Sequence, residues 1–335
     1  MEKGSGPILA CAFVGTGWWG AELARAAASL PDRIRIAGFL SLDEAECRKL
    51  SGQHGGEVFS SLDQILSSAS VDAVVLATPH SQHAAQAIAV AEAGKHVFVE
   101  KPMGLSVAEC DRVVKAVADA GVVLGVGFNR RTAPLAIKAK AAFASVREPK
   151  TLLYRINAGV VPAGHWLLDD AEGGGRLFGE GVHFLDFARW MFEAQPVSVA
   201  AAALGREGTG LDLDNNSVLV TFSDGSVATI VYSGQGAGSL SKERIEIFGG
   251  GEAVVIDDFI RLERHGSRTR GARDERLRRM DKGHAALLDN FVDAIAGRVP
   301  VAASADDGYW ATWCAEEAVR RLGASGGHAP GPQRG

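Results

Sequence analysis

A glycine-rich turn near the start of the chain constrains the fold most strongly. The stretch VGTGWWG at residues 14–20 places Gly15, Gly17 and Gly20 in a G-x-G-x-x-G pattern. It follows the apolar run ILACAFV at residues 8–14 and opens an Ala-rich helical stretch, which is the context that dinucleotide binding requires. The glycines permit a tight turn and close approach of a pyrophosphate to the free N–H groups of the helix. The turn therefore predicts a Rossmann domain.

Short apolar runs alternate with helical stretches up to residue 127. Their continuous apolar character is typical of parallel strands covered on both faces, and strand–helix–strand repetition implies right-handed crossovers. We therefore predict an α/β dinucleotide-binding domain with a doubly wound parallel sheet over residues 1–127. Strands are expected at 8–14, 34–40, 71–78, 96–100 and 121–127, and helices at 18–30, 43–51, 81–93 and 106–119.

The rhythm changes after residue 127, where strands follow one another through short turns. Turn signals such as SDG at 223–225 favour antiparallel hairpins. We predict an α+β domain over 128–322, with a mainly antiparallel open sheet for substrate binding and oligomerisation, and a disordered Gly/Pro-rich tail over 323–335. Strands are expected at 149–159, 197–204, 216–222, 226–234, 242–249, 252–257 and 259–264, and helices near 133–146, 183–193, 283–297 and 304–322.

Composition narrows the classes of partner. The formal net charge of −5 argues against a nucleic acid or an anionic membrane as the main partner. No apolar run approaches the roughly 20 residues of a membrane span, and the N-terminus lacks a signal-peptide pattern. The four cysteines lie far apart without metal-ligand spacing. We expect a cytoplasmic protein with reduced thiols and no metal.

The end of the second predicted strand bears on cofactor choice. An acid there usually holds the adenosine ribose hydroxyls. Asp43 would serve NAD, whereas Ser41 would admit the 2′-phosphate of NADP, although no Arg or Lys follows it directly. Both cofactors stay open, with NAD slightly favoured. Of Trp18 and Trp19, we expect one to contact cofactor or substrate and the other to pack in the core.

A lysine follows a buried strand in HVFVEKPMG, residues 96–104. Glu100, Lys101 and Pro102 come at the carboxyl end of that strand, the edge at which open parallel sheets bind ligands. A partly desolvated lysine can hold a substrate hydroxyl and lower its pKa. A lone lysine is more often a solvated surface charge, but the following proline and the glycine turn on the same edge favour a site.

A single histidine stands in GGGRLFGEGVHFLD, residues 173–186. An imidazole pKa near 6.5 suits His183 to acid–base chemistry, although a lone histidine is more often a buried, hydrogen-bonded side chain. Glu180 precedes it by three residues. Asp186, about one helical turn later, either orients the His183 ring or caps a helix or pairs with an arginine.

Taken together, these stretches resemble the Gfo/Idh/MocA oxidoreductases over nearly the whole chain. The resemblance is carried by VGTGWWG, LATPHSQHAAQAIAVAEAGKHVFVEKPMG, GFNRR at 127–131, and INAGVVPAGHW followed by GGGRLFGEGVHFLD. It implies an NAD(P)-dependent oxidoreductase that interconverts a secondary alcohol and a ketone on a sugar, a cyclitol or a sugar derivative such as a nucleotide-sugar. A homodimer or homotetramer is also implied.

The resemblance assigns roles to individual residues. Lys101 and His183 would act at the substrate hydroxyl. Many relatives carry an aspartate four residues before this histidine, where this chain has Gly179, so the pattern is closer to a GGGR-x-x-GE-x-x-HF-x-D branch. Either Glu180 replaces that acid in catalysis, or Lys101 and His183 suffice. We expect the cofactor to contact Gly15, Thr16, Gly17, Trp18, Trp19, Gly20, Ser41, Asp43, Thr78, Pro79, His80, His83, Glu100, Lys101, Asn129 and Arg130.

Substrate contacts are expected from the second domain. Trp166 beside His165 suits the apolar face of a sugar or cyclitol ring, with core packing and a surface position as the alternatives. Arg176 would meet an anionic group or form a structural ion pair. Asn157 and Asp186 complete the expected substrate set.

Two other functions fit the same pattern. One is an NAD-dependent glycosidase or lyase that uses transient oxidation, and the other is a non-catalytic NAD(P)-binding sensor. Retention of both Lys101 and His183 argues against the sensor, because a sensor needs only the cofactor.

Overall fold

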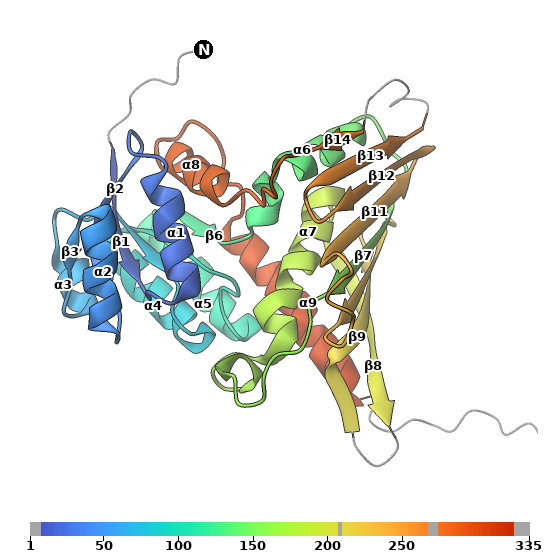
Figure 1. Ribbon diagram of the computed structural model, residues 1–335, viewed down its shortest axis with the longest axis horizontal. Coiled ribbons are helices and arrows are strands. Elements are labelled where there is room, and N and C mark those ends of the chain that lie inside the picture. The colour runs from blue at the N-terminus through green and yellow to red at the C-terminus, as the bar shows by residue number, and fades with distance from the viewer. Residues whose placement is uncertain (1–7, 207–209, 267–273, 325–335) are drawn as a thin grey trace, which may run out of the picture.

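The computed structural model describes residues 8–206, 210–266 and 274–324 (Figure 1). The first sheet has six parallel strands in the order β3-β2-β1-β4-β5-β6, the doubly wound arrangement that the sequence predicts. Its strands are β1 (Leu9–Val14), β2 (Ile34–Leu40), β3 (Glu57–Val58), β4 (Ala73–Leu76), β5 (His96–Val99) and β6 (Leu124–Val126). Its helices are α1 (Trp18–Ala28), α2 (Glu44–His54), α3 (Leu62–Ser67), α4 (His80–Glu92) and α5 (Val107–Ala120).

The second sheet has eight strands in the order β14-β13-β12-β11-β7-β10-β9-β8. Neighbours pair antiparallel, except that β7 and β10 are parallel, so the sheet is mainly antiparallel as expected. The strands are β7 (Thr151–Asn157), β8 (Pro196–Arg206), β9 (Gly210–Phe222), β10 (Val227–Ser233), β11 (Glu243–Gly249), β12 (Glu252–Asp257), β13 (Arg261–His265) and β14 (Glu275–Arg276). The expected tail over 323–335 lies outside the described residues apart from its first two positions.

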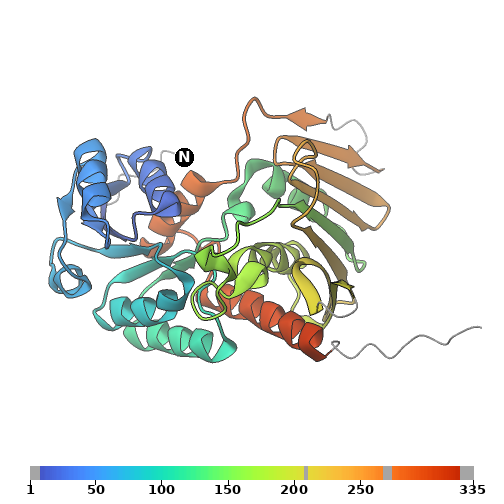
Figure 2. The same ribbon diagram turned by 60° about the horizontal axis from the view of Figure 1, so that its bottom comes forward.

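Helices α6 (Pro134–Ala142), α7 (Val182–Phe192) and α9 (Ala305–Ala324) lie against one face of this sheet (Figures 1 and 2). The other face carries no helix among the described residues. It exposes apolar side chains such as Leu219 and Phe248, which alternate with buried residues along β9 and β11. Three short helices complete the chain: η1 (Asn129–Thr132), η2 (Trp166–Leu168) and the π-helical turn η3 (Leu177–Gly181).

Two C-terminal helices return to the first domain. Helix α8 (His284–Ile295) buries Leu287, Leu288 and Phe291 in the hydrophobic cluster of the first sheet, where Phe291 packs edge-on against Phe98 with ring centroids 5.6 Å apart. Figure 1 shows α8 beside α1, and α9 packs against α5. The domain boundary at residue 127 stays a prediction. The later helix α8 also contributes to the core of the first domain, so that domain is not one continuous stretch of chain.

A buried arginine ties three elements of the second domain together. Arg131 in η1 donates to both carboxylate oxygens of Asp186 in α7, at 2.9 and 2.6 Å, and to Asp307 in α9 at 2.8 Å. A buried charge is tolerated when it is paired and hydrogen-bonded in this way. Asp186 therefore forms the arginine pair, one of the alternatives that the sequence left open. Its expected contact with substrate stays a prediction.

Two helical glycines offer a matched test of the fold. A Cβ atom on Gly20 would lie 1.9 Å from the carbonyl oxygen of Gly15, whereas a Cβ atom on Gly52 would meet nothing within 4 Å. We expect Gly52→Ala to raise the free energy of unfolding by up to about 1 kcal/mol, since alanine loses less backbone entropy in a helix. Gly20→Ala should lower it by about 1 to 3 kcal/mol through overpacking. Urea unfolding measures both values, and equal changes would contradict the described packing.

Candidate active site

The carboxyl ends of β1, β4 and β5 meet at one edge of the first sheet, and the predicted lysine lies there. Lys101 follows β5, is buried, and donates from Nζ to the carbonyl oxygen of Gly179 at 2.7 Å. Gly179 belongs to the π-helical turn η3, which leads directly into the helix that carries His183. The structure thus brings the segment of Lys101 and that of His183 together across the two domains. Isolated π-helical turns are frequent at functional sites.

The glycine turn fits a dinucleotide. Gly15 has φ +91°, and a Cβ atom there would lie 2.4 Å from the carbonyl oxygen of Ala77, so the turn requires glycine. Gly17 is the N-cap of α1 and no side chain caps the helix, while a Cβ atom on Gly17 would meet nothing within 4 Å. The first-turn N–H groups are therefore open to an anion such as a pyrophosphate. Thr16 between the two glycines is buried.

The two tryptophans of the turn do not divide as expected. Trp18 is 72% exposed and Trp19 is 38% exposed, so the prediction that one of them packs in the core is wrong. The buried face of α1 begins only at Gly20, and the first turn of the helix extends beyond the core. Both indole rings are left beside the glycine turn.

The turn after β2 carries acids. Asp43 is exposed and caps α2, because its Oδ1 accepts from the backbone N–H of Glu46 at 3.0 Å. The Oγ of Ser41 accepts from the backbone N–H of Asp43 at 3.3 Å. Glu44 and Glu46 add negative charge in the first turn of α2. The surroundings of Ser41 are therefore acidic.

Two histidines after β4 hold neighbouring loops. Nδ1 of His80 lies 2.8 Å from the carbonyl oxygen of Gly173, and His83 lies between two carbonyl oxygens, with Nδ1 2.7 Å from Pro102 and Nε2 2.8 Å from Thr78. Burial lowers the pKa of His80 to about 3 and that of His83 to about 4. Both rings are neutral at pH 7, so His83 donates to one of its two carbonyls at a time.

The remaining residues of this edge are fixed by local contacts. Pro79 is the N-cap of α4, and the hydroxyl of Thr78 donates to Gln86 at 2.7 Å. Glu100 is buried beside Lys101. Burial raises the pKa of Glu100 and lowers that of Lys101, each shift favouring the neutral form.

His183 is buried and lacks a protein partner at one nitrogen. Its ring packs edge-on against Phe128, with centroids 5.9 Å apart, and its Nδ1 has no hydrogen-bond partner among the described residues. Burial lowers the pKa of His183 well below its ordinary value, and the nearby charges of Arg130 and Lys101 lower it further. The ring is neutral at pH 7 and keeps a lone pair able to accept a proton. A buried polar atom without a partner is expected at a ligand site rather than in a plain core.

Glu180 contacts the second sheet instead of the imidazole. Its carboxylate accepts from the hydroxyl of Tyr232 and from the ammonium of Lys242. Burial acts to raise the pKa of Glu180, but Lys242 and Tyr232 outweigh it and lower the pKa. A catalytic role for Glu180 therefore stays a prediction, and the hydrogen bonds described for its carboxylate are with Tyr232 and Lys242 rather than with His183.

The space beside Gly179 is filled from another loop. A Cβ atom on Gly179 would lie 2.2 Å from Cδ1 of Leu167 and 3.3 Å from Cε1 of His80. A longer side chain at 179 would have to displace Leu167. This contact explains the glycine in physical terms.

Two residues that the sequence predicts to contact the substrate form hydrogen bonds to other protein groups. The amide nitrogen of Asn157 donates to the carbonyl oxygens of Ala237 at 2.7 Å and Leu240 at 3.2 Å, which secures the loop between β10 and β11. Arg176 donates to the hydroxyl of Tyr232 at 2.7 Å and to the carbonyl oxygen of Gly159, the structural alternative for this residue. Direct substrate contact by either side chain stays a prediction, because Oδ1 of Asn157 and Nε of Arg176 have no hydrogen-bond partner among the described residues.

The loop after β7 places His165 and Trp166 at the site edge. Nδ1 of His165 accepts from the backbone N–H of Leu167 at 3.2 Å. Trp166 is 38% exposed, and its ring meets His80 edge-on with centroids 4.8 Å apart. An indole that is partly exposed beside the first domain remains available to a ligand.

The segment that enters the second domain is fixed by hydrogen bonds to β11 and to the chain just before α8. Nδ2 of Asn129 donates to the carbonyl oxygen of Lys282 at 2.8 Å, and Arg130 donates two bonds to Glu243, at 2.8 and 2.7 Å. Their cofactor contacts stay predictions, and the structure shows both side chains hydrogen-bonded to the protein. Sequence reasoning missed Glu243 and Tyr232. Glu243 lies at an inward position of the alternating strand ERIEIFG, so the period-2 pattern could have indicated a buried acid there.

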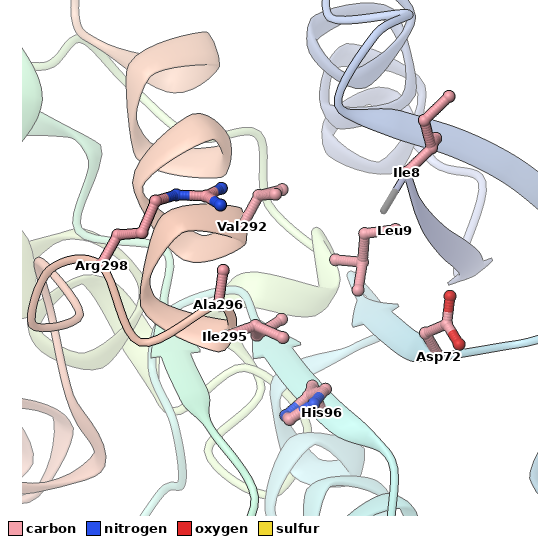
Figure 3. A pocket seen from close by; sticks show the side chains of 8 residues that line it. All are labelled: Ile8, Leu9, Asp72, His96, Val292, Ile295, Ala296 and Arg298. Carbon is pink, nitrogen blue, oxygen red and sulfur yellow. The ribbon is translucent and has the colours of Figure 1, made fainter. Parts of the chain in front are cut away.

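A cavity of about 470 Å³ lies elsewhere (Figure 3). Its lining includes Ile8 and Leu9 at the start of β1, Asp72 just before β4 and His96 at the start of β5, with the end of α8 opposite. These are the amino ends of the strands, whereas the glycine turn and Lys101 follow their carboxyl ends. We therefore place the site at the Lys101 edge.

Across the described ranges, no helix is both long and apolar enough to cross a membrane.

Comparison with known proteins agrees with this geometry. Residues 9–128 match a model described as an oxidoreductase family with an NAD-binding Rossmann fold, and residues 145–254 match the GFO/IDH/MocA C-terminal domain. An inositol 2-dehydrogenase of Saccharopolyspora erythraea is 30% identical over 326 residues, covering 95% of this chain and 94% of the relative.

Solved structures share the whole architecture. GenD2 from gentamicin A biosynthesis, solved in complex with NAD, is 26% identical with a TM-score of 0.80 and 95% of each chain covered. A UDP-N-acetylglucosamine 3-dehydrogenase from Acidithiobacillus ferrooxidans is 25% identical with a TM-score of 0.78, covering 95% of this chain and 100% of that one. The chain belongs to the Gfo/Idh/MocA family of oxidoreductases, with an NAD-binding Rossmann domain.

Proposed function

We propose that the protein interconverts a secondary alcohol and a ketone on a sugar or cyclitol, with NAD as the hydride carrier. The observation that carries the proposal is the meeting of buried Lys101 with the segment of neutral His183, at the sheet edge that also holds the glycine turn. The names of the inositol and nucleotide-sugar dehydrogenases that the chain resembles support the substrate class.

His183 acts as the base for the substrate hydroxyl. Its neutral ring accepts the hydroxyl proton as the carbonyl bond forms, and the hydride leaves the carbinol carbon, so the alcohol loses two electrons and two hydrogens. Bound NAD would supply the acceptor for that hydride at its nicotinamide ring. In the reverse direction, protonated His183 returns its proton to the new hydroxyl.

Lys101 stabilises the alkoxide that develops during proton removal. Its ammonium is buried and is already oriented by the Gly179 carbonyl, so little reorganisation is needed when negative charge appears. Residues that would hold the cofactor are those of the glycine turn, with Gly17 and Trp18 contributing backbone N–H groups. Glu180 would hold the side chains of Tyr232 and Lys242 in place and so help to shape the substrate-binding side of the site.

NAD is the better fit of the two dinucleotides. The turn after β2 carries Asp43, Glu44 and Glu46, whose charges would repel a 2′-phosphate. Arg48 and Lys49 in the same helix are already paired with Glu44 and Glu46.

The apolar side chains exposed on the open sheet face support a homodimer or homotetramer.

Replacement of the two central residues tests the proposal. We expect Lys101→Met and His183→Gln each to lower kcat by at least about a hundredfold, because each removes acid–base or electrostatic help at the hydroxyl. NAD binding should persist in both. Lys115→Met and His265→Gln, at exposed positions in α5 and β13, are matched controls. Near-normal turnover in either central variant would refute the assigned roles.

The cofactor preference is tested at Leu42, whose side chain is fully exposed beside Ser41. Wild-type protein should show at least about a tenfold higher kcat/KM for NAD than for NADP, since the local charge is negative. Leu42→Arg should narrow that ratio at least about fivefold by supplying a cation for the 2′-phosphate, while the neutral Leu42→Gln leaves it unchanged. A wild-type preference for NADP would contradict the proposal.

A further inference from the structure

A ring pair joins the first turns of helices α1 and α8. Trp19 lies in the first turn of α1, and His284 is the first residue of α8. Their ring centroids are 5.6 Å apart with planes inclined at 36°, while the other neighbour of Trp19 is the ring of Trp18, at 4.4 Å and 73°. His284 has no role among the residues discussed so far.

The backbone before His284 is fixed from the second domain. Gly283 has φ +84°, and a Cβ atom on it would lie 2.5 Å from the backbone of Thr132 and Ala133, so only glycine fits. The hydroxyl of Thr132 donates to the carbonyl oxygen of Gly283 at 2.8 Å, and Asn129 holds the preceding carbonyl of Lys282 at the same distance. The His284 ring is therefore presented from an anchored segment rather than from a free loop.

The following helix anchors the same segment in the first domain. Helix α8 buries Leu287, Leu288 and Phe291 against the first sheet. His284 thus occupies the junction of three parts: the first domain's core, the η1 segment and the glycine turn. A ring presented from a backbone that is anchored on both sides can hold the exposed indole of Trp19 in one position.

The His284 ring lies close enough to His183 for the two imidazoles to interact electrostatically. Its charge state acts on His183, and Arg130 acts on both rings, so the two histidines share one electrostatic environment. A dinucleotide whose pyrophosphate binds at the first turn of α1 would have its nicotinamide half directed toward Lys101 and His183. The Trp19–His284 pair adjoins both the turn and that environment.

We infer that Trp19 and His284 form a clamp for the pyrophosphate–nicotinamide half of the bound dinucleotide, with His284 as the positioning residue that holds the indole. The inference rests on the proposed function, because it takes NAD as the ligand. Aromatic pairs of this kind contribute enough to change an affinity severalfold when one ring is removed. The adenosine half, which would lie toward β2 and Ser41, is outside the clamp.

Calorimetric titration of the full chain with NAD and with AMP separates the two halves of the ligand. We expect His284→Ala to raise the Kd for NAD about fivefold and to leave the Kd for AMP unchanged. His284→Phe keeps a ring against Trp19 and should restore most of the NAD affinity. Trp19→Ala should weaken NAD binding similarly, and the double variant should be little weaker than either single one, because the two side chains act as a unit.

His265→Ala, at an exposed position in β13, is the matched control for loss of a histidine and should bind NAD as wild type does. An unchanged Kd for NAD in His284→Ala, an equal loss of NAD and AMP affinity, or additive losses in the double variant would each overturn the clamp while leaving the proposed reaction intact. Wild-type protein that binds neither ligand would instead overturn the proposed function, and the clamp with it.

Discussion

The hydrogen bond from Lys101 Nζ to the carbonyl oxygen of Gly179 is the contact on which the arrangement of the site depends. It joins the strand end of the first domain to the π-helical turn that opens the His183 helix. A buried ammonium needs such a partner, because an unpaired charge in the interior is costly. With Gly179 in place, Leu167 and His80 fill the space beside the turn, so a backbone oxygen rather than a side-chain acid orients the lysine.

Burial disfavours the charged form of the histidines and the arginines around this bond alike, but the outcome depends on their partners. The histidines His80, His83 and His183 are neutral, since desolvation disfavours their charged form. The arginines Arg130 and Arg131 keep their charge through carboxylate partners, Glu243 for one and Asp186 with Asp307 for the other. The proposed reaction needs a neutral base beside a fixed positive charge, and the proposal assigns these roles to His183 and Lys101.

The sequence predicted best where a local pattern has one structural solution. Continuous apolar runs indicated the parallel strands β1, β2, β4, β5 and β6, and the glycine turn appeared where expected. The short elements β3 and α3 were missed, because two and six residues carry no readable periodicity. Contacts between distant segments, such as Leu167 on Gly179 and His284 on Trp19, left no local signal. For Asp186, several partners were possible, and only the packing of η1 against α7 selected Arg131.

Accumulation of reduced cofactor tests the central claim most directly. Purified protein would be incubated with NAD and a panel of cyclitols, free sugars, nucleotide-sugars and aryl glycosides, while nicotinamide absorbance and the appearance of ketone product are both followed. The account predicts that at least one polyol gives NADH and ketone in equal amounts, with the transferred hydrogen coming from the carbinol carbon. Release of aglycone from a glycoside without net NADH, or binding of NAD without turnover of any polyol, would contradict it.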